Sequence, residues 1–128
     1  MWLQIDPKSP VPVYQQIVDG VKIGIAKGIF QPGERIPSIR ESAIDLMLNH
    51  NTVAKAYREL EHEGVIVTLR GRGTFVTENR LIPDRELRVG ALKDLLKRVL
   101  IESHYLQLSE DELFDLLKAV IADWHGNS

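Results

Sequence analysis

Two helix-start signals stand close together in the first half of the chain. Ser38 is followed three residues later by Glu41, which forms a capping box in which each side chain bonds the backbone amide of the other residue. Asn49 is a second N-cap residue and precedes an amphipathic stretch. A helix that begins at Ser38 must therefore end near Leu46, because the next helix begins at Asn49. Two short helices separated by a turn form a helix-turn-helix.

The second of these helices has one apolar face and is followed by a predicted β-hairpin. Gly64 marks its end, and its apolar residues at helical spacing are Val53, Ala56, Tyr57 and Leu60. Two β-branched runs follow, at 65–69 and 74–77, on either side of the loop Arg70-Gly71-Arg72-Gly73. Such runs around a glycine-containing loop predict a hairpin. The order of elements is that of a winged helix.

The chain on either side of this segment is predicted to be helical. Apolar spacings of three and four over 13–27 predict a helix behind a proline-rich lead-in. The stretch 84–105 is rich in leucine, and Ser109-Glu110-Asp111-Glu112 is another capping box that opens a last amphipathic helix. We therefore predict a mainly α fold with a small β-hairpin. It consists of an N-terminal winged helix-turn-helix domain over 11–79 and a short C-terminal helical segment over 80–128.

Composition narrows the classes of function. The 128 residues carry a formal net charge of −2. They include no cysteine, and this absence excludes disulfide scaffolds, thiolate zinc sites and cysteine nucleophiles. No apolar run approaches the roughly 18 residues that span a bilayer, and the N-terminus lacks the features of a secretory signal. We expect a cytoplasmic protein without membrane contact. No catalytic constellation, P-loop or dinucleotide fingerprint occurs, so we expect neither an enzyme nor a cofactor.

The histidines and an acidic run do not predict a metal site. His62, His104 and His125 lie far apart and lack ligand spacing, so we expect surface histidines. The acidic run 110–112 is explained by a helix N-terminus, which favours negative charge.

Several dispersed motifs within 10–78 resemble the N-terminal domain of GntR-type bacterial transcriptional regulators. They are Pro12-Val13-Tyr14-Gln15-Gln16-Ile17, Gln31-Pro32-Gly33-Glu34-Arg35-Ile36-Pro37-Ser38 with Arg40-Glu41, Asn51-Thr52-Val53, Tyr57-Arg58-Glu59-Leu60, Glu63-Gly64-Val65-Ile66 and Arg70-Gly71-Arg72-Gly73-Thr74-Phe75-Val76. The stretch from Asn49 to Tyr57 and the short helical C-terminal segment resemble the YtrA-like subfamily. The resemblance implies a DNA-binding transcriptional regulator, most often a repressor.

The helix predicted after Asn49 is the expected recognition helix. Such a helix reads base edges in the major groove through its N-terminal residues. Asn pairs with adenine, and Lys reaches guanine or a phosphate. The contacts that we predict for this helix and its cap are Asn49, His50, Asn51, Thr52, Lys55 and Arg58. Three alternatives stay open: a cap alone for Asn49, a solvated polar face for Asn51 and Lys55, and pairing with neighbouring acids for Arg58.

Further contacts with DNA are expected from the first short helix and from the wing. By the resemblance, Arg40 contacts the DNA backbone or a guanine, with a simple surface charge as the alternative, and Ser38 contacts a phosphate besides capping its helix. Arg70 and Arg72 project from a loop suited to the minor groove or to phosphates. The glycines of this loop, Gly71 and Gly73, let the backbone turn tightly and approach the DNA closely.

Three positions depart from the family pattern. Met47 stands where members usually have glycine, so we expect the turn to form without easy access to positive φ. Ser42 stands where many members have a hydrophobic residue. His50 stands where members often have Arg or Pro, which changes the expected base preference and introduces a dependence on pH.

The C-terminal helices carry more apolar surface than a two-helix hairpin can bury. The predicted dimerisation residues are Leu95, Leu96, Val99, Leu100, Leu113, Leu116, Leu117, Val120, Ile121 and Trp124. Burial contributes roughly 0.8 kcal/mol per methylene, so we expect a twofold homodimer through a helical bundle. Packing of this hairpin on the chain's own winged helix is the alternative.

These expectations combine into one function. We predict a homodimeric repressor that binds a palindromic operator in double-stranded DNA. A winged helix that serves as a protein-interaction module, without sequence-specific DNA reading, is the alternative. Too little chain remains for a separate ligand domain, so a small-molecule effector would bind between the winged helix and the C-terminal helices. We expect Trp2, Tyr14, Tyr105 or Trp124 to line that cavity.

Overall fold

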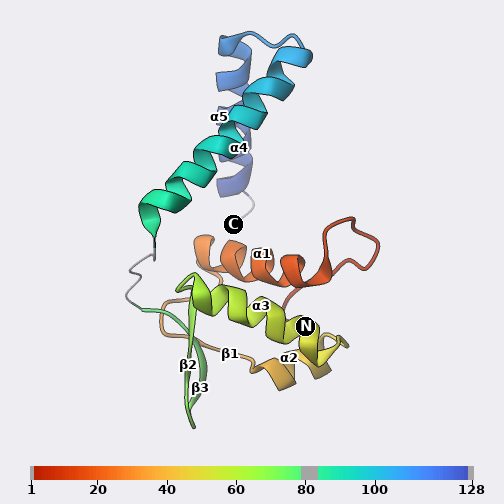
Figure 1. Ribbon diagram of the computed structural model, residues 1–128, viewed down its shortest axis with the longest axis vertical. Helices are drawn as coiled ribbons and strands as arrows, with labels where there is room; N and C mark the ends of the chain where they lie inside the picture. Colours follow the sequence, from red (N-terminus) through yellow and green to blue (C-terminus); the bar gives the residue numbers. More distant parts are fainter. Residues whose placement is uncertain (1, 79–83, 127–128) are drawn as a thin grey trace. The chain divides into compact units, whose positions relative to one another are not determined.

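The chain folds into two compact units, residues 1–83 and 84–128, which we call the winged unit and the helical unit (Figure 1). The computed structural model describes residues 2–78 and 84–126, and side chains as far as residue 124. No helix in this part of the chain has the length and apolar character that crossing a membrane requires. Each unit is described by itself.

The winged unit contains three helices and a small sheet. Its elements are α1 (Val13–Ala26), β1 (Arg35–Ile36), α2 (Ile39–Asp45), α3 (His50–His62), β2 (Ile66–Leu69) and β3 (Gly73–Val76). The sheet is antiparallel with the strand order β1-β3-β2, and Val67 pairs with Phe75 in the hairpin register. The predicted winged helix-turn-helix is confirmed. The two-residue strand β1 was not predicted, and it extends the hairpin into a three-stranded sheet through the pair Arg35 and Phe75.

Both predicted helix starts in the helix-turn-helix are confirmed by their cap hydrogen bonds. The Glu41 amide donates to Ser38 Oγ at 3.1 Å, and the Ser38 amide donates to Glu41 Oε1 at 3.1 Å. The Asn51 amide donates to Asn49 Oδ1 at 2.8 Å. These bonds satisfy amides that have no partner within their own helix.

The turn between α2 and α3 differs from our expectation, because Met47 does adopt a positive φ of 56°. The Leu48 amide donates to the Ala43 carbonyl at 2.9 Å, and the Met47 amide donates to the Ile44 carbonyl at 3.3 Å. This pair of bonds is a Schellman motif, which requires a left-handed residue just after the helix. The expectation of a turn without positive φ is therefore wrong, since the helix-ending bonds hold methionine in that conformation.

Hydrophobic residues from all three helices, the sheet and the N-terminal segment form the core of the winged unit. Tyr57 is fully buried there, and its hydroxyl donates to the Pro37 carbonyl at 2.6 Å. Ser42 Oγ lies 2.8 Å from the same phenolic oxygen. The serine that departs from the family pattern thus has a buried partner, and burial raises the pKa of Tyr57 to about 12.

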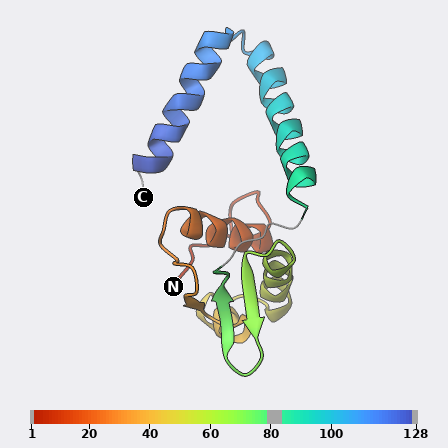
Figure 2. The same ribbon diagram turned by 90° about the vertical axis from the view of Figure 1, so that its left-hand side faces the viewer.

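The helical unit is a pair of helices, α4 (Arg85–Tyr105) and α5 (Glu110–Gly126). A short turn joins them, from which they diverge (Figure 2). The predicted capping box is confirmed, because the Glu112 amide donates to Ser109 Oγ and the Ser109 amide donates to Glu112 Oε1, each at 3.1 Å. Among the described residues of this unit only Ser103 is buried. The described part of the helical unit therefore has no hydrophobic core of its own within a single chain.

Candidate nucleic-acid interface

Helix α3 buries one face and presents the other to solvent. Its core residues are Val53, Ala56, Tyr57 and Leu60, all buried, as the sequence predicts. Most of the side chains predicted to contact DNA lie off this face: His50, Asn51, Lys55 and Arg58 are exposed, and Thr52 is half-buried. The helix packs against α1 and α2, which hold its exposed face in a fixed orientation within the winged unit.

The N-terminus of α3 has a cap that already uses one polar atom. Asn49 Oδ1 accepts a hydrogen bond from the Asn51 amide, so this oxygen is engaged in capping the start of the helix. The amide nitrogen of the Asn49 side chain forms no hydrogen bond with another described residue. Asn49 can therefore cap the helix and still donate to a phosphate, and its role in DNA binding stays a prediction.

Lys55 has a partner that the sequence did not predict. Its Nζ lies 3.9 Å from the centroid of the Tyr14 ring, which belongs to the first turn of α1. An ammonium over the face of an aromatic ring is attracted to the ring's quadrupole. Residues 14 and 55 are far apart in the chain, so only the packing of α1 on α3 reveals this contact.

The N-terminus of α2 brings two arginines to the surface. Arg40 is exposed and forms no ion pair with another described residue. Arg35, on β1, lies 3.1 Å from Glu41 Oε1, the same carboxylate that completes the capping box. Hydrogen bonds from Ser38, and then the Arg35 guanidinium, hold the pKa of Glu41 below its ordinary value of 4.5.

Gly73, at the base of the wing, has two structural reasons to be glycine. Its φ is 127°, a conformation that side chains disfavour. A Cβ at this position would lie 2.9 Å from Arg35 Nε, so the glycine makes room for the arginine that reaches Glu41. We predicted Gly73 for a tight turn and for close approach to DNA. The sequence did not reveal Arg35 as its neighbour, because β1 was not predicted.

The wing carries its two arginines on the loop between β2 and β3. This loop projects beyond the helices of the winged unit (Figure 2). Arg70 and Arg72 are both exposed, and Gly71 between them has a φ of 78°. The Arg72 amide donates to the Leu69 carbonyl at 2.9 Å, which closes the turn. Neither arginine forms an ion pair with another described residue.

The acidic residues near the end of α3 have partners other than Arg58. Glu61 Oε1 accepts a hydrogen bond from Thr68 Oγ1 at 2.9 Å, and Glu63 pairs with Lys22 at 2.7 Å. Arg58 is exposed, and no ion pair joins it to the part of the chain that the structure describes. The alternative of pairing with neighbouring acids is not what the structure shows.

The histidines and carboxylates gather no metal-ligand set among the described residues. His62 and His104 are exposed, as we expected of surface histidines. The side chain of His125 lies outside the described part of the chain.

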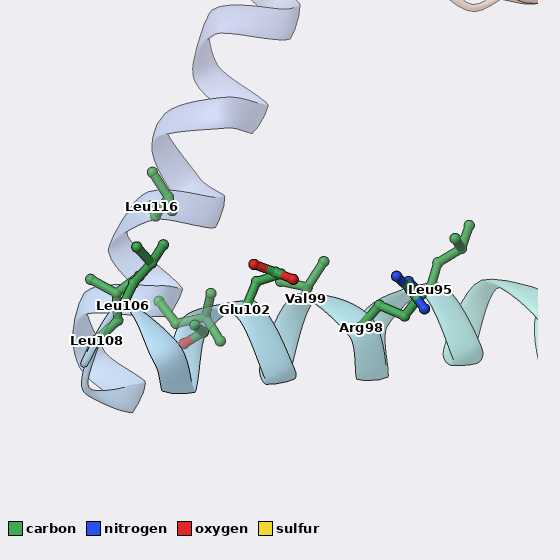
Figure 3. A pocket seen from close by; sticks show the side chains of 9 residues that line it. Leu95, Arg98, Val99, Glu102, Leu106, Leu108 and Leu116 are labelled. Carbon is green, nitrogen blue, oxygen red and sulfur yellow. The ribbon is translucent and has the colours of Figure 1, made fainter. Parts of the chain in front are cut away.

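The helical unit exposes the predicted dimerisation residues. Leu113 is half-buried and the others are exposed. Where α4 and α5 meet, a cavity of about 380 Å³ opens (Figure 3), lined by Leu95, Arg98, Val99, Glu102, Ser103, Leu106, Leu108, Leu113 and Leu116. Most of this lining is apolar. None of the four aromatic residues expected around an effector lines it, and Trp2 packs on Phe30 instead, with ring centroids 5.6 Å apart.

Comparison with known proteins gives consistent matches. Residues 13–76 match the model of bacterial regulatory proteins of the gntR family. The chain is 44% identical to the HTH-type transcriptional repressor YtrA of Bacillus subtilis over 97% of this chain and 95% of that protein. A solved Listeria monocytogenes structure, described as a transcriptional antiterminator, has 38% identity and a TM-score of 0.81, covering 95% of this chain and 91% of that one. The AraR DNA-binding domain in complex with operator ORX1 has 26% identity and a TM-score of 0.53, covering 59% and 96%.

Proposed function

Since the chain belongs to the GntR family of bacterial regulatory proteins and is a DNA-binding transcription regulator, we propose that it acts as a homodimeric repressor. It reads a palindromic operator with α3 and the wing. Its similarity to YtrA, which is named a transcriptional repressor, supports repression and not activation. The AraR domain, solved with its operator, supports a winged unit that binds duplex DNA.

The observation that carries this proposal is a set of exposed arginines that have no acidic partner among the described residues. The set comprises Arg40 on α2, Arg58 on α3, and Arg70 and Arg72 on the wing. Each guanidinium that neutralises a phosphate releases condensed counterions from DNA, which makes binding favourable. A surface that contacts only another protein would not need so many unpaired positive charges on three neighbouring elements.

The exposed face of α3 supplies the base readers in this proposal. Asn51 pairs with adenine, and His50 replaces the Arg or Pro common in the family. Arg40 contacts a guanine or the backbone, while Ser38, Asn49 and Thr52 contact phosphates. Arg58 also contacts the backbone. Arg70, Arg72 and Gly73 enter the minor groove or follow its edge.

Dimerisation follows from the lack of a core in the helical unit. Leucine and other apolar side chains stay exposed along both α4 and α5 in a single chain. Many large apolar side chains exposed along two adjoining helices are characteristic of an interface. A twofold axis through the helical unit would present two copies of α3 to half-sites about one DNA turn apart.

This function needs no catalytic group and no cofactor, and the protein would act in the cytoplasm, where bacterial operators lie.

An effector would act through the helical unit. The cavity between α4 and α5 shares Leu95, Val99, Leu113 and Leu116 with the proposed dimer interface, so ligand binding would alter dimerisation. Operator affinity measured across a panel of small metabolites tests this part. Unchanged affinity throughout the panel contradicts an effector.

Selection of bound sequences from random duplex DNA tests the main proposal. We expect an inverted repeat whose half-sites lie about one helical turn apart. The double substitution Arg70→Ala and Arg72→Ala should weaken binding and reduce the slope of log affinity against log salt by about 2. Lys93→Gln, which removes an exposed charge from α4, serves as the control. Absence of an enriched sequence, or binding that does not depend on salt, would support a protein-interaction module instead.

A further inference from the structure

The most specific unexplained contact in the winged unit is the one between Lys55 and Tyr14. Lys55 lies one helical turn after Asn51, so the two side chains share the exposed face of α3. From spacing alone, both would face the groove, where Asn51 pairs with adenine and Lys55 reaches either a guanine or a phosphate. The structure separates them, because the ammonium of Lys55 lies over the Tyr14 ring at 3.9 Å from its centroid.

The position of Tyr14 determines which side of α3 the ammonium occupies. Tyr14 lies in the first turn of α1, and α1 packs side by side with α3 (Figure 1). The ammonium of Lys55 therefore sits on the flank of α3 that faces α1. A recognition helix in the major groove has base edges in front of it and sugar-phosphate backbone along its flanks.

We propose that Lys55 binds a phosphate of the DNA backbone and reads no base, and that Tyr14 is the positioning residue that holds its ammonium on that flank. This rests on the proposed function, in which α3 enters the major groove. A lysine ammonium has three N–H donors. Its attraction to a ring face leaves donors available for the oxygens of a phosphate. Lys55 also forms no ion pair with another described residue, so its donors are available to a phosphate.

The ring of Tyr14, and not its hydroxyl, carries the positioning role. The hydroxyl makes no hydrogen bond to the described part of the chain. Phenylalanine keeps the ring face and leucine removes it, while both preserve an apolar side chain of comparable size against the core. The two substitutions therefore separate positioning from packing.

The experiment measures binding of the full-length variants to the selected operator and to a random-sequence duplex across a salt series. Lys55→Gln should weaken binding to both duplexes by the same factor, about tenfold, and lower the salt slope by about 1. The sequence selected from random DNA should stay that of the parent protein. Tyr14→Leu should reproduce part of the loss on both duplexes, and Tyr14→Phe should retain the parent affinity. In the Lys55→Gln background, Tyr14→Leu should have no further effect.

Three results would overturn the proposal. One is a changed base preference at a single position in Lys55→Gln, which would make Lys55 a base reader. Another is equal loss in Tyr14→Phe and Tyr14→Leu, which would assign the role to the hydroxyl. The third is an additive loss in the double variant, which would make Tyr14 act independently of Lys55. Failure of the proposed function looks different, because the parent protein itself would then select no operator.

Discussion

Capping boxes begin one helix and Schellman bonds end at least one helix in each of the two units, yet among the described residues only the winged unit has a hydrophobic core. Every residue of the buried hydrophobic cluster lies between residues 3 and 76, in the winged unit. In the helical unit, Ser103 is the one buried residue that the structure describes. Local signals therefore begin and end helices in both units, whereas burial stabilises the winged unit within one chain and leaves the apolar side chains of the helical unit for the proposed dimer to cover.

Helix ends make the similarity concrete. Schellman bonds end α1, α2, α3 and α4, with left-handed residues at Gly28, Met47, Gly64 and Gln107. In α4 the Leu108 amide donates to the Ser103 carbonyl and the Gln107 amide donates to the His104 carbonyl, both at 3.0 Å. Each unit thus contains one such turn without glycine, at Met47 and at Gln107. The units differ in what their helices bury and not in how they end.

The largest expected effect comes from a core substitution in the winged unit. Leu60 is fully buried, so Leu60→Ala should lower the free energy of unfolding by about 3 kcal/mol. Urea denaturation followed by circular dichroism at several protein concentrations measures this change. The loss should not depend on concentration.

Leu100→Ala in α4 is the matched comparison, because Leu100 is exposed within a single chain. Its effect should grow as the protein is concentrated into dimers. A large loss for Leu100→Ala in the monomer would contradict the difference between the units.

A charge placed on the helical unit should give the next largest effect. Leu117 is 47% exposed in the single chain and belongs to the proposed interface. Leu117→Arg should raise the dimer dissociation constant about 100-fold, equivalent to about 3 kcal/mol. Analytical ultracentrifugation measures it. Ile29→Arg adds the same charge at a 63% exposed position of the winged unit and should leave association unchanged.

The sequence predicted the elements that depend on local signals. The capping boxes at Ser38 and Ser109 and the glycine-containing wing were all recognised, because each is encoded within a few residues. Strand β1 was missed because two residues form a strand only by pairing with β3, about forty residues later. The outcome at Met47 was missed for a related reason, since the helix-ending bonds outweigh the conformational cost to one residue.

Most of the residues predicted to contact DNA are exposed, but two of the contacts that these residues make within the chain were not predicted. Lys55 was predicted from its place off the apolar face of the recognition helix and Gly73 from the glycine-containing wing, but their neighbours Tyr14 and Arg35 were not predicted. These contacts join elements distant in sequence, so no periodicity reports them. The hydroxyl contact between Ser42 and Tyr57 was missed for the same reason.

The glycine-free turns allow a smaller test within each unit. A left-handed methionine costs about 1–2 kcal/mol, part of which is offset by the greater entropy that glycine has when unfolded. Met47→Gly should therefore raise the free energy of unfolding of the winged unit by about 0.5–1 kcal/mol. Met47→Ala, which keeps a Cβ, is the control and should give no gain.

Gln107→Gly is the equivalent change in the helical unit, where φ is 59°. It should stabilise the protein by a similar amount, but only through the dimer, so that the gain in melting temperature rises with protein concentration. A gain that is the same at every concentration would show that the helical unit is stable without a partner.

The smallest expected effect concerns the capping box of α2, which differs from that of α5 by the presence of Arg35. The pKa of Glu41 is lower in the folded chain than its ordinary value of 4.5, first because of the hydrogen bonds from Ser38 and then because of Arg35. At a pH near 4.5 the unfolded chain therefore binds more protons at Glu41 than the folded chain does. The contribution of Glu41 to the free energy of unfolding is complete above pH 4.5 and is lost as the pH falls through the lower pKa of the folded chain. In Glu41→Gln this part of the pH dependence should disappear, as measured by urea denaturation between pH 3 and 7.

Arg35→Gln should leave most of this pH dependence in place, because the Ser38 hydrogen bonds lower the pKa of Glu41 more than the guanidinium does. If Arg35→Gln instead removes the whole dependence, the ion pair and not the helix cap stabilises the carboxylate. The two capping boxes would then differ in their chemistry as well as in their surroundings.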